Sequence, residues 1–202
     1  MSEALKIPTS PQVGLYQNGG KRCIDFVGAL GVLVVLAPAL LLISALIIVT
    51  DPGPIIFVQR RVGRYGKVFH FFKFRSMPVG TKNLPSDQIG SVRLTWLGRL
   101  LRRTNLDELP QLVNILKGDM SFVGPRPSLP SQANLNKLRE LHGALVCRPG
   151  LSGLAQVSSY DGMPIEAKAS FDGEYAAAIS LVRDVKIILR TFRYLTKPPP
   201  VY

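Results

Sequence analysis

The stretch that decides the fold is FVGALGVLVVLAPALLLISALIIV, residues 26–49, which carries no charged side chain. As one straight helix it would be about 36 Å long at 1.5 Å per residue, enough to cross a bilayer core about 30 Å thick. The run begins well inside the chain and lacks the small-residue cleavage pattern of a signal peptide. We therefore expect residues 21–50 to form a membrane helix.

Two features favour a helix that enters one leaflet, bends and returns. Pro38 stands at the centre of the run, where it removes a backbone hydrogen bond and crowds the preceding turn. Basic residues lie on both sides, with Lys21 and Arg22 before the run and Arg60 and Arg61 after it, so the positive-inside bias draws both ends to the cytoplasmic face. Prolines are also common in spanning helices, and these signals alone leave a kinked span equally open.

The composition limits the class of partner. Charged residues make up 19% of the chain, and 25 Lys+Arg against 13 Asp+Glu give a net charge of +12. This basicity indicates an anionic partner: nucleic acid, an anionic leaflet or a phosphorylated substrate. The apolar run and the lack of a recognised nucleic-acid motif exclude nucleic acid from our expectation. Cys23 and Cys147 form no disulfide framework.

The remaining sequence predicts an α+β protein. Residues 1–20 read as a loose or surface-lying arm, and residues 51–202 as one compact domain. Two β-rich runs at 55–62 and 67–74 are typical of a hairpin. Helices are expected at 92–104, 131–143 and 171–197. The first is basic and amphipathic, with Trp96 and Leu100 among its apolar residues, which suits either a membrane interface or a face packed on the core.

Two adjacent acids stand out in this basic chain. They stand at the start of a predicted helix that runs from about Asp107 to Lys117 and stops at Gly118, with Asp107 as the N-cap and Glu108 in the first turn. Paired carboxylates at a helix start can hold Mg²⁺ together with phosphate oxygens, and a carboxylate can also attack phosphorus. Ordinary helix capping is the simpler alternative for two acids considered alone.

Several cations could complete a phosphate site around this pair. Arg126 is held rigidly between two prolines, and Arg148 precedes a Pro-Gly pair. Lys73, Arg75 and Arg103 could add charge stabilisation for a transferring phosphoryl group. Each of these residues alone is more simply a solvated cation, but together they favour phosphate binding.

Four segments carry a resemblance to a known family. KRCID (21–25), FKFRSM (72–77), LRRTNLDELPQLVNILKGDMSFVGPRP (101–127) and RPGLSGLAQV (148–157) occur in the order found in bacterial sugar transferases, the monotopic phosphoglycosyl transferases. The likeness runs from about residue 21 to residue 191, and the LDELPQL…KGDMS block is highly specific. With no additional membrane domain ahead of residue 21, the chain resembles the minimal, single-domain form.

The resemblance implies a fold and a reaction. It implies a re-entrant helix bent at Pro38 in the bacterial inner membrane and a catalytic domain, with several interfacial helices, on the cytoplasmic face. Asp107 would attack the sugar-bearing phosphate of a UDP-sugar, UMP would leave, and undecaprenyl phosphate would take the phosphosugar. Glu108 would help to hold Mg²⁺, and Arg126 would contact phosphate.

The chain also departs from the family pattern. Ala37 replaces the usual Ser before the proline, so the bend should depend more on Pro38 and on helix packing. Ser158 and Ser159 replace a usual Asn-Gly pair, which weakens any inference about the sugar. A non-catalytic module that binds anionic lipid at the membrane surface is the competing hypothesis. The oligomeric state, a homo-oligomer included, and the glycoconjugate pathway are left open.

Overall fold

A computed structural model describes residues 15–81, 94–158 and 163–195. Its elements, in chain order, are η1 (Tyr16–Gly20), α1 (Lys21–Thr50), β1 (Ile56–Val62), η2 (Arg64–Gly66), β2 (Val68–Phe74), α2 (Trp96–Thr104), η4 (Leu106–Glu108), α3 (Gln111–Lys117), β3 (Ser121–Val123), α4 (Ala133–Leu141), η5 (Ala144–Val146), β4 (Gly150–Ser152), α5 (Leu154–Ser158), α6 (Ile165–Ala177) and α7 (Leu181–Leu195). The expected mixture of helices and small sheets behind a long apolar N-terminal helix is confirmed.

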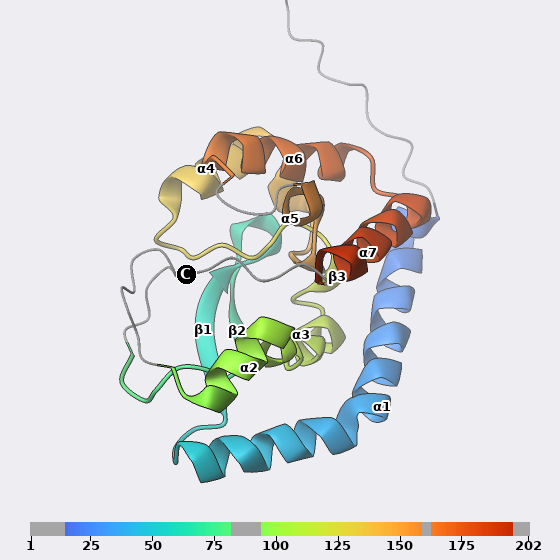
Figure 1. The fold of residues 1–202 in the computed structure, drawn as a ribbon. Helices are drawn as coiled ribbons and strands as arrows, with labels where there is room; N and C mark the ends of the chain where they lie inside the picture. The colour runs from blue at the N-terminus through green and yellow to red at the C-terminus, as the bar shows by residue number, and fades with distance from the viewer. Residues whose placement is uncertain (1–14, 82–93, 159–162, 196–202) are drawn as a thin grey trace, which may run out of the picture.

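Helix α1 wraps around two sides of the molecule. Figure 1 shows it as two arms that meet at a bend near the middle of the helix, and Pro38 lies inside the helix. In the first arm, Ala29 packs in a core cluster with Leu112 and Ile115 of α3. In the second arm, Ile43 and Ile47 pack in another cluster with residues of β2 and α2. Because each arm has its own apolar contact surface, packing holds the bend together with the proline.

The outer surface of α1 is apolar and uncovered. Val35, Leu41 and Val49 are each more than 70% exposed, and the only buried residues of the helix are Asp25, Ala29, Ile43 and Ile47. By length and composition, the helical stretch Tyr16–Thr50 is long enough and apolar enough to cross a membrane. Such an exposed apolar surface is expected to face lipid rather than water.

Both ends of α1 are attached to the same body of the protein. At the start, Lys21 forms an ion pair of 2.5 Å with Asp184 of α7. At the other end, Asp51 accepts a hydrogen bond from Arg75 through its main-chain oxygen, and their charged groups lie 3.5 Å apart. Gly53, with φ +146°, lies against the Arg75 guanidinium, where a side chain would collide with it.

The predicted hairpin is confirmed to within one residue at each end. Strand β1 pairs antiparallel with β2 in a register that places Phe57 opposite Lys73 and Arg61 opposite Phe69. In Figure 1 the hairpin stands at the centre of the molecule, behind α2 and α3. It therefore forms a scaffold from which side chains reach neighbouring elements.

A second small sheet was not predicted from the sequence. Strands β3 and β4 pair in parallel, and Gly124 directly after β3 donates a hydrogen bond of 2.9 Å to the Ser152 carbonyl. A Cβ atom on Gly124 would lie 2.2 Å from the Arg148 carbonyl oxygen, so only glycine allows this close approach. The sheet fixes the start of the Pro125–Pro127 segment.

The C-terminal helix prediction was wrong in one respect. The expected single helix at 171–197 is two helices, α6 and α7, separated at residues 178–180. Ala178 has a non-helical backbone, and the Ser180 hydroxyl accepts a hydrogen bond from the Arg183 main-chain N–H, which caps the new helix. The helix expected at 131–143 is α4, and Gly143 beyond it has a left-handed backbone.

Helix α2 uses its two apolar faces differently. Leu97 and Leu101 are buried against the second arm of α1, whereas Trp96 is 55% exposed and Leu100 46% exposed. One side therefore packs on the protein, as the simpler alternative held, and the other remains available to a membrane interface. The start of the predicted helix at residue 92, most of the arm at 1–20 and Ser159 lie outside the described residues.

Candidate active site

The two acids do not begin a long helix, contrary to the sequence prediction. Asp107 and Glu108 belong to the short 3₁₀ turn η4, and α3 begins only at Gln111, with Pro110 at its N-cap position. The chain enters this turn through Asn105, which has a left-handed backbone at the end of α2. The position of the acids is thus set by a tight α2–η4–α3 connection and not by the first turn of an α-helix.

Asp107 is a buried carboxyl group with a perturbed titration. It is 7% exposed, and burial together with the neighbouring Glu108 raises its pKa to about 6. Lys73, Arg102 and Arg126 act in the opposite direction and limit the rise. A carboxylate that is desolvated but close to cations stays ionised at neutral pH and remains reactive, which suits a nucleophile.

Glu108 is held in a different way from its neighbour. Its Oε1 accepts a hydrogen bond of 2.6 Å from Arg126. Burial alone would raise the pKa of Glu108, but Arg126, Lys73 and the side-chain amide of Gln111 outweigh it and lower that pKa. Adjacent acids with opposite shifts have different chemical tasks available to them.

The Pro125–Pro127 segment brings Arg126 to the acids. The Gly150 main-chain N–H donates to the Pro125 carbonyl at 2.9 Å, and the Val62 N–H donates to the Ser128 carbonyl at 2.8 Å. The segment is therefore fastened between β4 on one side and the end of β1 on the other. The sequence prediction that Arg126 lies at the acid pair is consistent with this placement.

Lys73 approaches the acids from β2. Burial lowers its pKa, while Asp107 and Glu108 counter that effect. The fully buried Asn114 of α3 fixes the strand, because its amide donates to the His70 carbonyl at 2.7 Å and accepts from the Phe72 N–H at 3.0 Å. One buried amide thus sets the register between the strand that carries Lys73 and the helix after the acids.

The other predicted cations lie in three different settings. Arg75 is engaged with Asp51, as described above, and also lines a cavity beside the hairpin. Arg103 is exposed on α2. Arg148 donates to the Gly118 carbonyl at 2.9 Å, and Arg22 donates to the carbonyls of Ile115 and Leu116, so these two arginines cap the C-terminal end of α3.

The sequence analysis did not identify two basic residues, Arg102 and Arg61, as part of the site. Arg102, not its neighbour Arg103, is the α2 arginine that acts on Asp107. Arg61 of β1 lies close enough to Glu108 and Arg126 to interact with both, and burial with Arg126 lowers its pKa to about 10. The alternation of β1 was the available signal for Arg61, since it places residues 57, 59 and 61 on one face.

The acid pair fits a Mg²⁺ ion of the kind that binds with its substrate. Mg²⁺ typically takes one or two protein carboxylates and completes its coordination with phosphate oxygens and water. Within the described residues no group of three or more acidic, histidine or cysteine side chains converges. Asp107 and Glu108 would therefore supply the protein's share, and the substrate the remainder.

The class of protein follows from the fold and the site together. A bent apolar helix is joined to a small domain in which the buried Asp107 and the partly buried Glu108 lie near several cations, and this combination suits an enzyme that handles phosphate at a membrane. Residues 16–198 match the model of the bacterial sugar transferase family. The chain belongs to this family, as the sequence resemblance predicted.

This chain spans different shares of the individual relatives that it matches. The chain is 34% identical over 199 residues to undecaprenyl-phosphate galactose phosphotransferase of Salmonella typhimurium, covering 90% of this chain and 41% of that protein. It is 39% identical to UDP-glucose:undecaprenyl-phosphate glucose-1-phosphate transferase of Caulobacter vibrioides, covering 85% of this chain and 67% of that protein. The exopolysaccharide production protein PSS of Rhizobium leguminosarum bv. phaseoli is also 39% identical, with 85% of this chain and 92% of that protein covered. The chain thus spans about two fifths of the first relative and nearly all of the last.

Proposed function

We propose that this protein transfers a sugar 1-phosphate from a UDP-sugar to undecaprenyl phosphate and releases UMP. Relatives at 34–39% identity carry names for this reaction with galactose and glucose donors. The reaction would be an early membrane step of bacterial glycoconjugate synthesis. The observation that carries the proposal is the buried Asp107 beside an ion-paired Glu108, because these are two acids with separate tasks at a phosphate-binding surface.

In the proposed mechanism Asp107 is the nucleophile. Its carboxylate oxygen forms a bond to the sugar-bearing phosphorus, the bond from that phosphorus to the bridging oxygen breaks, and UMP leaves. A phosphate oxygen of undecaprenyl phosphate then attacks the same phosphorus and releases the carboxylate. Lys73 and Arg102 lie where they would balance the negative charge around Asp107 during both steps.

Glu108 and Arg126 have supporting roles in this proposal. The ion pair fixes the Glu108 carboxylate beside the nucleophile, and Arg126, whose side chain is 46% exposed, would contact substrate phosphate. When bound, Mg²⁺ would neutralise charge on the diphosphate. Binding roles for Arg75, Arg103 and Arg148 remain predictions from the sequence.

The proposed membrane arrangement is a re-entrant helix in the cytoplasmic leaflet, with residues 51–202 as the catalytic domain on the cytoplasmic face. The support is the attachment of both ends of α1 to one domain, through Lys21 to Asp184 and through Asp51 to Arg75. A straight helix of this length would separate its ends by about 45 Å, across the bilayer. The domain could not then hold both ends.

The function is tested by UMP release from a panel of UDP-sugars in the presence of undecaprenyl phosphate and Mg²⁺. We expect release with at least one donor, and its loss in Asp107→Asn while the variant remains in the membrane fraction. Retained turnover by Asp107→Asn would remove the nucleophile assignment. Lack of turnover with every donor, combined with binding to anionic vesicles, would favour the non-catalytic membrane-binding alternative.

A further inference from the structure

A cavity of about 320 Å³ lies between the β1–β2 hairpin and residues 75–81. Much of its wall is apolar, including Phe57, Met77 and Val79. None of the described residues that line it is acidic. A hydroxyl-rich sugar would find few carboxylate partners there, whereas an anion with an apolar body would be accommodated.

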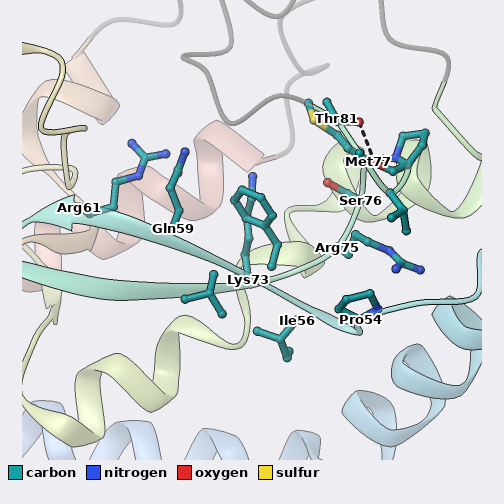
Figure 2. Close-up of a pocket in the computed structure, with 14 residues that line it drawn as sticks. Pro54, Ile56, Gln59, Arg61, Lys73, Arg75, Ser76, Met77 and Thr81 are labelled. Atoms are coloured by element: carbon teal, nitrogen blue, oxygen red, sulfur yellow. Dashed lines mark hydrogen bonds between the residues drawn. The ribbon is translucent and has the colours of Figure 1, made fainter.

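Two cations in the cavity lining interact with the acid pair. Lys73 and Arg61 both line it, and Figure 2 shows their side chains rising with Gln59 from the same side of the hairpin. Lys73 interacts with Asp107 and Glu108, and Arg61 interacts with Glu108. The cavity therefore reaches the proposed reaction centre through these two side chains.

Arg61 carries a buried donor group that the described part of the chain does not satisfy. One of its terminal nitrogens donates to the Pro127 carbonyl at 3.1 Å, and its guanidinium carbon lies 5.3 Å from the centre of the Phe71 ring. Its buried Nε has no hydrogen-bond partner among the described residues. A buried N–H without a partner is costly, and an anion bound against the Arg61 side chain would offset part of that cost.

In the proposed reaction, a phosphate monoester occupies the position opposite Asp107 in each of the two half-reactions. In the first half-reaction, UMP departs from phosphorus as the aspartyl bond forms. In the second, undecaprenyl phosphate attacks that phosphorus as the aspartyl bond breaks. UMP and undecaprenyl phosphate are both phosphate monoesters, and each occupies the position opposite Asp107 while its own bond to phosphorus breaks or forms.

We propose that this cavity is one shared subsite for the phosphate monoester of both half-reactions. Lys73 and Arg61 bind the phosphate, and the apolar wall accepts the uracil ring first and the initial isoprene units afterwards. The cavity volume is near the lower end of the range for ligand pockets, about 300–1,000 Å³, so it suits one such group at a time. The inference rests on the proposed function.

The location of the cavity suits a lipid that arrives from the membrane. Pro54 lines it and stands four residues beyond the last residue of α1, Thr50. Val79 at its rim is 60% exposed and packs beside Gly53, in the turn that leaves the helix. A prenyl chain would therefore have only a short distance to cover from the apolar surface of α1 to the cavity, past the Asp51–Arg75 ion pair.

The test uses direct binding, so that it does not depend on turnover. Purified protein in detergent is titrated with UMP by calorimetry, and then with UMP in the presence of farnesyl phosphate or farnesol. We expect farnesyl phosphate to compete with UMP and farnesol to compete much less. Simultaneous binding of UMP and farnesyl phosphate would overturn the shared subsite.

A rim variant tests the same inference by another route. Val79→Trp should weaken both UMP and farnesyl phosphate binding by a similar factor, because its indole enters the common space. Leu141→Trp on α4 is the matched control at a residue 73% exposed and away from the cavity lining, and it should change neither. An effect on one ligand alone, or on neither, would contradict a shared subsite.

A cation variant tests which groups hold the phosphate. Loss of one charge-assisted hydrogen bond corresponds to roughly tenfold or more in affinity, so Arg61→Met should weaken both ligands by about that factor. Should UMP bind as proposed while no UDP-sugar is turned over, the proposed function fails and the anion site stands. If a UDP-sugar is turned over but UMP and farnesyl phosphate do not compete, the proposed function stands and the shared subsite fails.

Discussion

Glu108 and Arg126 are joined by a hydrogen-bonded ion pair of 2.6 Å, and this contact separates the properties of two acids that are adjacent in sequence. The pair lowers the pKa of Glu108, whereas burial and the nearby Glu108 charge raise the pKa of Asp107 to about 6. Glu108 is therefore stabilised as an anion by Arg126, whereas the ionised form of Asp107 is destabilised by burial and by the charge of Glu108.

The first prediction concerns stability at this site. Because the folded-state pKa of Asp107 is above its unfolded value, folding favours the protonated form, and the ionised side chain costs stability above about pH 6. Asp107→Asn should therefore raise the free energy of unfolding by about 1–3 kcal/mol at pH 7.5, and by less as the pH falls from 6 to 4. Denaturant unfolding in detergent at several pH values measures this.

Glu108→Gln is the matched control for that experiment. The folded-state pKa of Glu108 is lowered, so its charge contributes stability above its unfolded pKa that is lost on acidification. This variant should be less stable than the parent at pH 7.5, the opposite sign from Asp107→Asn. The same sign for both variants would argue against different roles for the two carboxyls.

The second prediction concerns the pH dependence of the rate. If the Asp107 carboxylate is the nucleophile, single-turnover UMP release should fall about tenfold per pH unit below a midpoint near 6. Raising the Mg²⁺ concentration should move the midpoint to lower pH, because a nearby cation favours the ionised carboxyl. A rate that stays constant between pH 5 and pH 8 would exclude the titration of this group from the first step.

The third prediction tests the coupling between Glu108 and Arg126. Arg126→Met leaves the partly buried Glu108 carboxylate without its main partner. Because the Arg126 side chain is 46% exposed, the variant should cost only about 0.5–1 kcal/mol of stability, as well as activity. In the double variant with Glu108→Gln much of the stability should return, but not the activity. Equal effects of Arg126→Met in the presence and absence of Glu108 would show that the ion pair contributes no coupling free energy.

Some features of the fold could be predicted from local patterns. The uncharged run before and after Pro38 indicates a bent apolar helix, and the alternation on either side of Gly63 indicates the hairpin. Such patterns depend on residues close together in the chain. The parallel pairing of β3 with β4 could not be predicted in this way, because each strand has only three residues and the partners come from distant segments.

Part of the site could also be predicted, because some of its residues lie close together in the sequence. Asp107, Glu108 and Arg126 belong to one continuous motif, and the structure brings them together. Arg61 reaches the acids only because β1 is fastened to the segment after Arg126, which a single sequence does not reveal. Arg148 has a motif-like setting beside Pro149 and Gly150, but its contacts are with the end of α3.

The fourth prediction separates structural support from substrate binding at Arg148. Its guanidinium donates to the Gly118 carbonyl, so Arg148→Ala should lower the free energy of unfolding by about 1–2 kcal/mol. If support is its whole role, KM for the UDP-sugar should stay within about twofold at a temperature where the variant is folded. Arg190→Ala, at an exposed arginine of α7, is the control for loss of a positive charge. A large rise in KM without loss of stability would restore the binding role predicted from the sequence.

The fifth prediction concerns the membrane arrangement of α1. Asn18 and Lys67 are exposed residues on either side of the helix, and single cysteines can replace them in a Cys23→Ser background, since Cys147 is buried. A membrane-impermeant maleimide should label both positions in inverted inner-membrane vesicles and neither in intact spheroplasts. Permeabilised spheroplasts serve as the control, because both positions should then react.

The physical reason for this expectation is that Lys21 and Asp51, at the two ends of α1, are each ion-paired to the same domain, which can lie on only one side of the bilayer. Labelling of one position in each preparation would establish a spanning helix and would place the acid pair and the start of α1 on opposite faces.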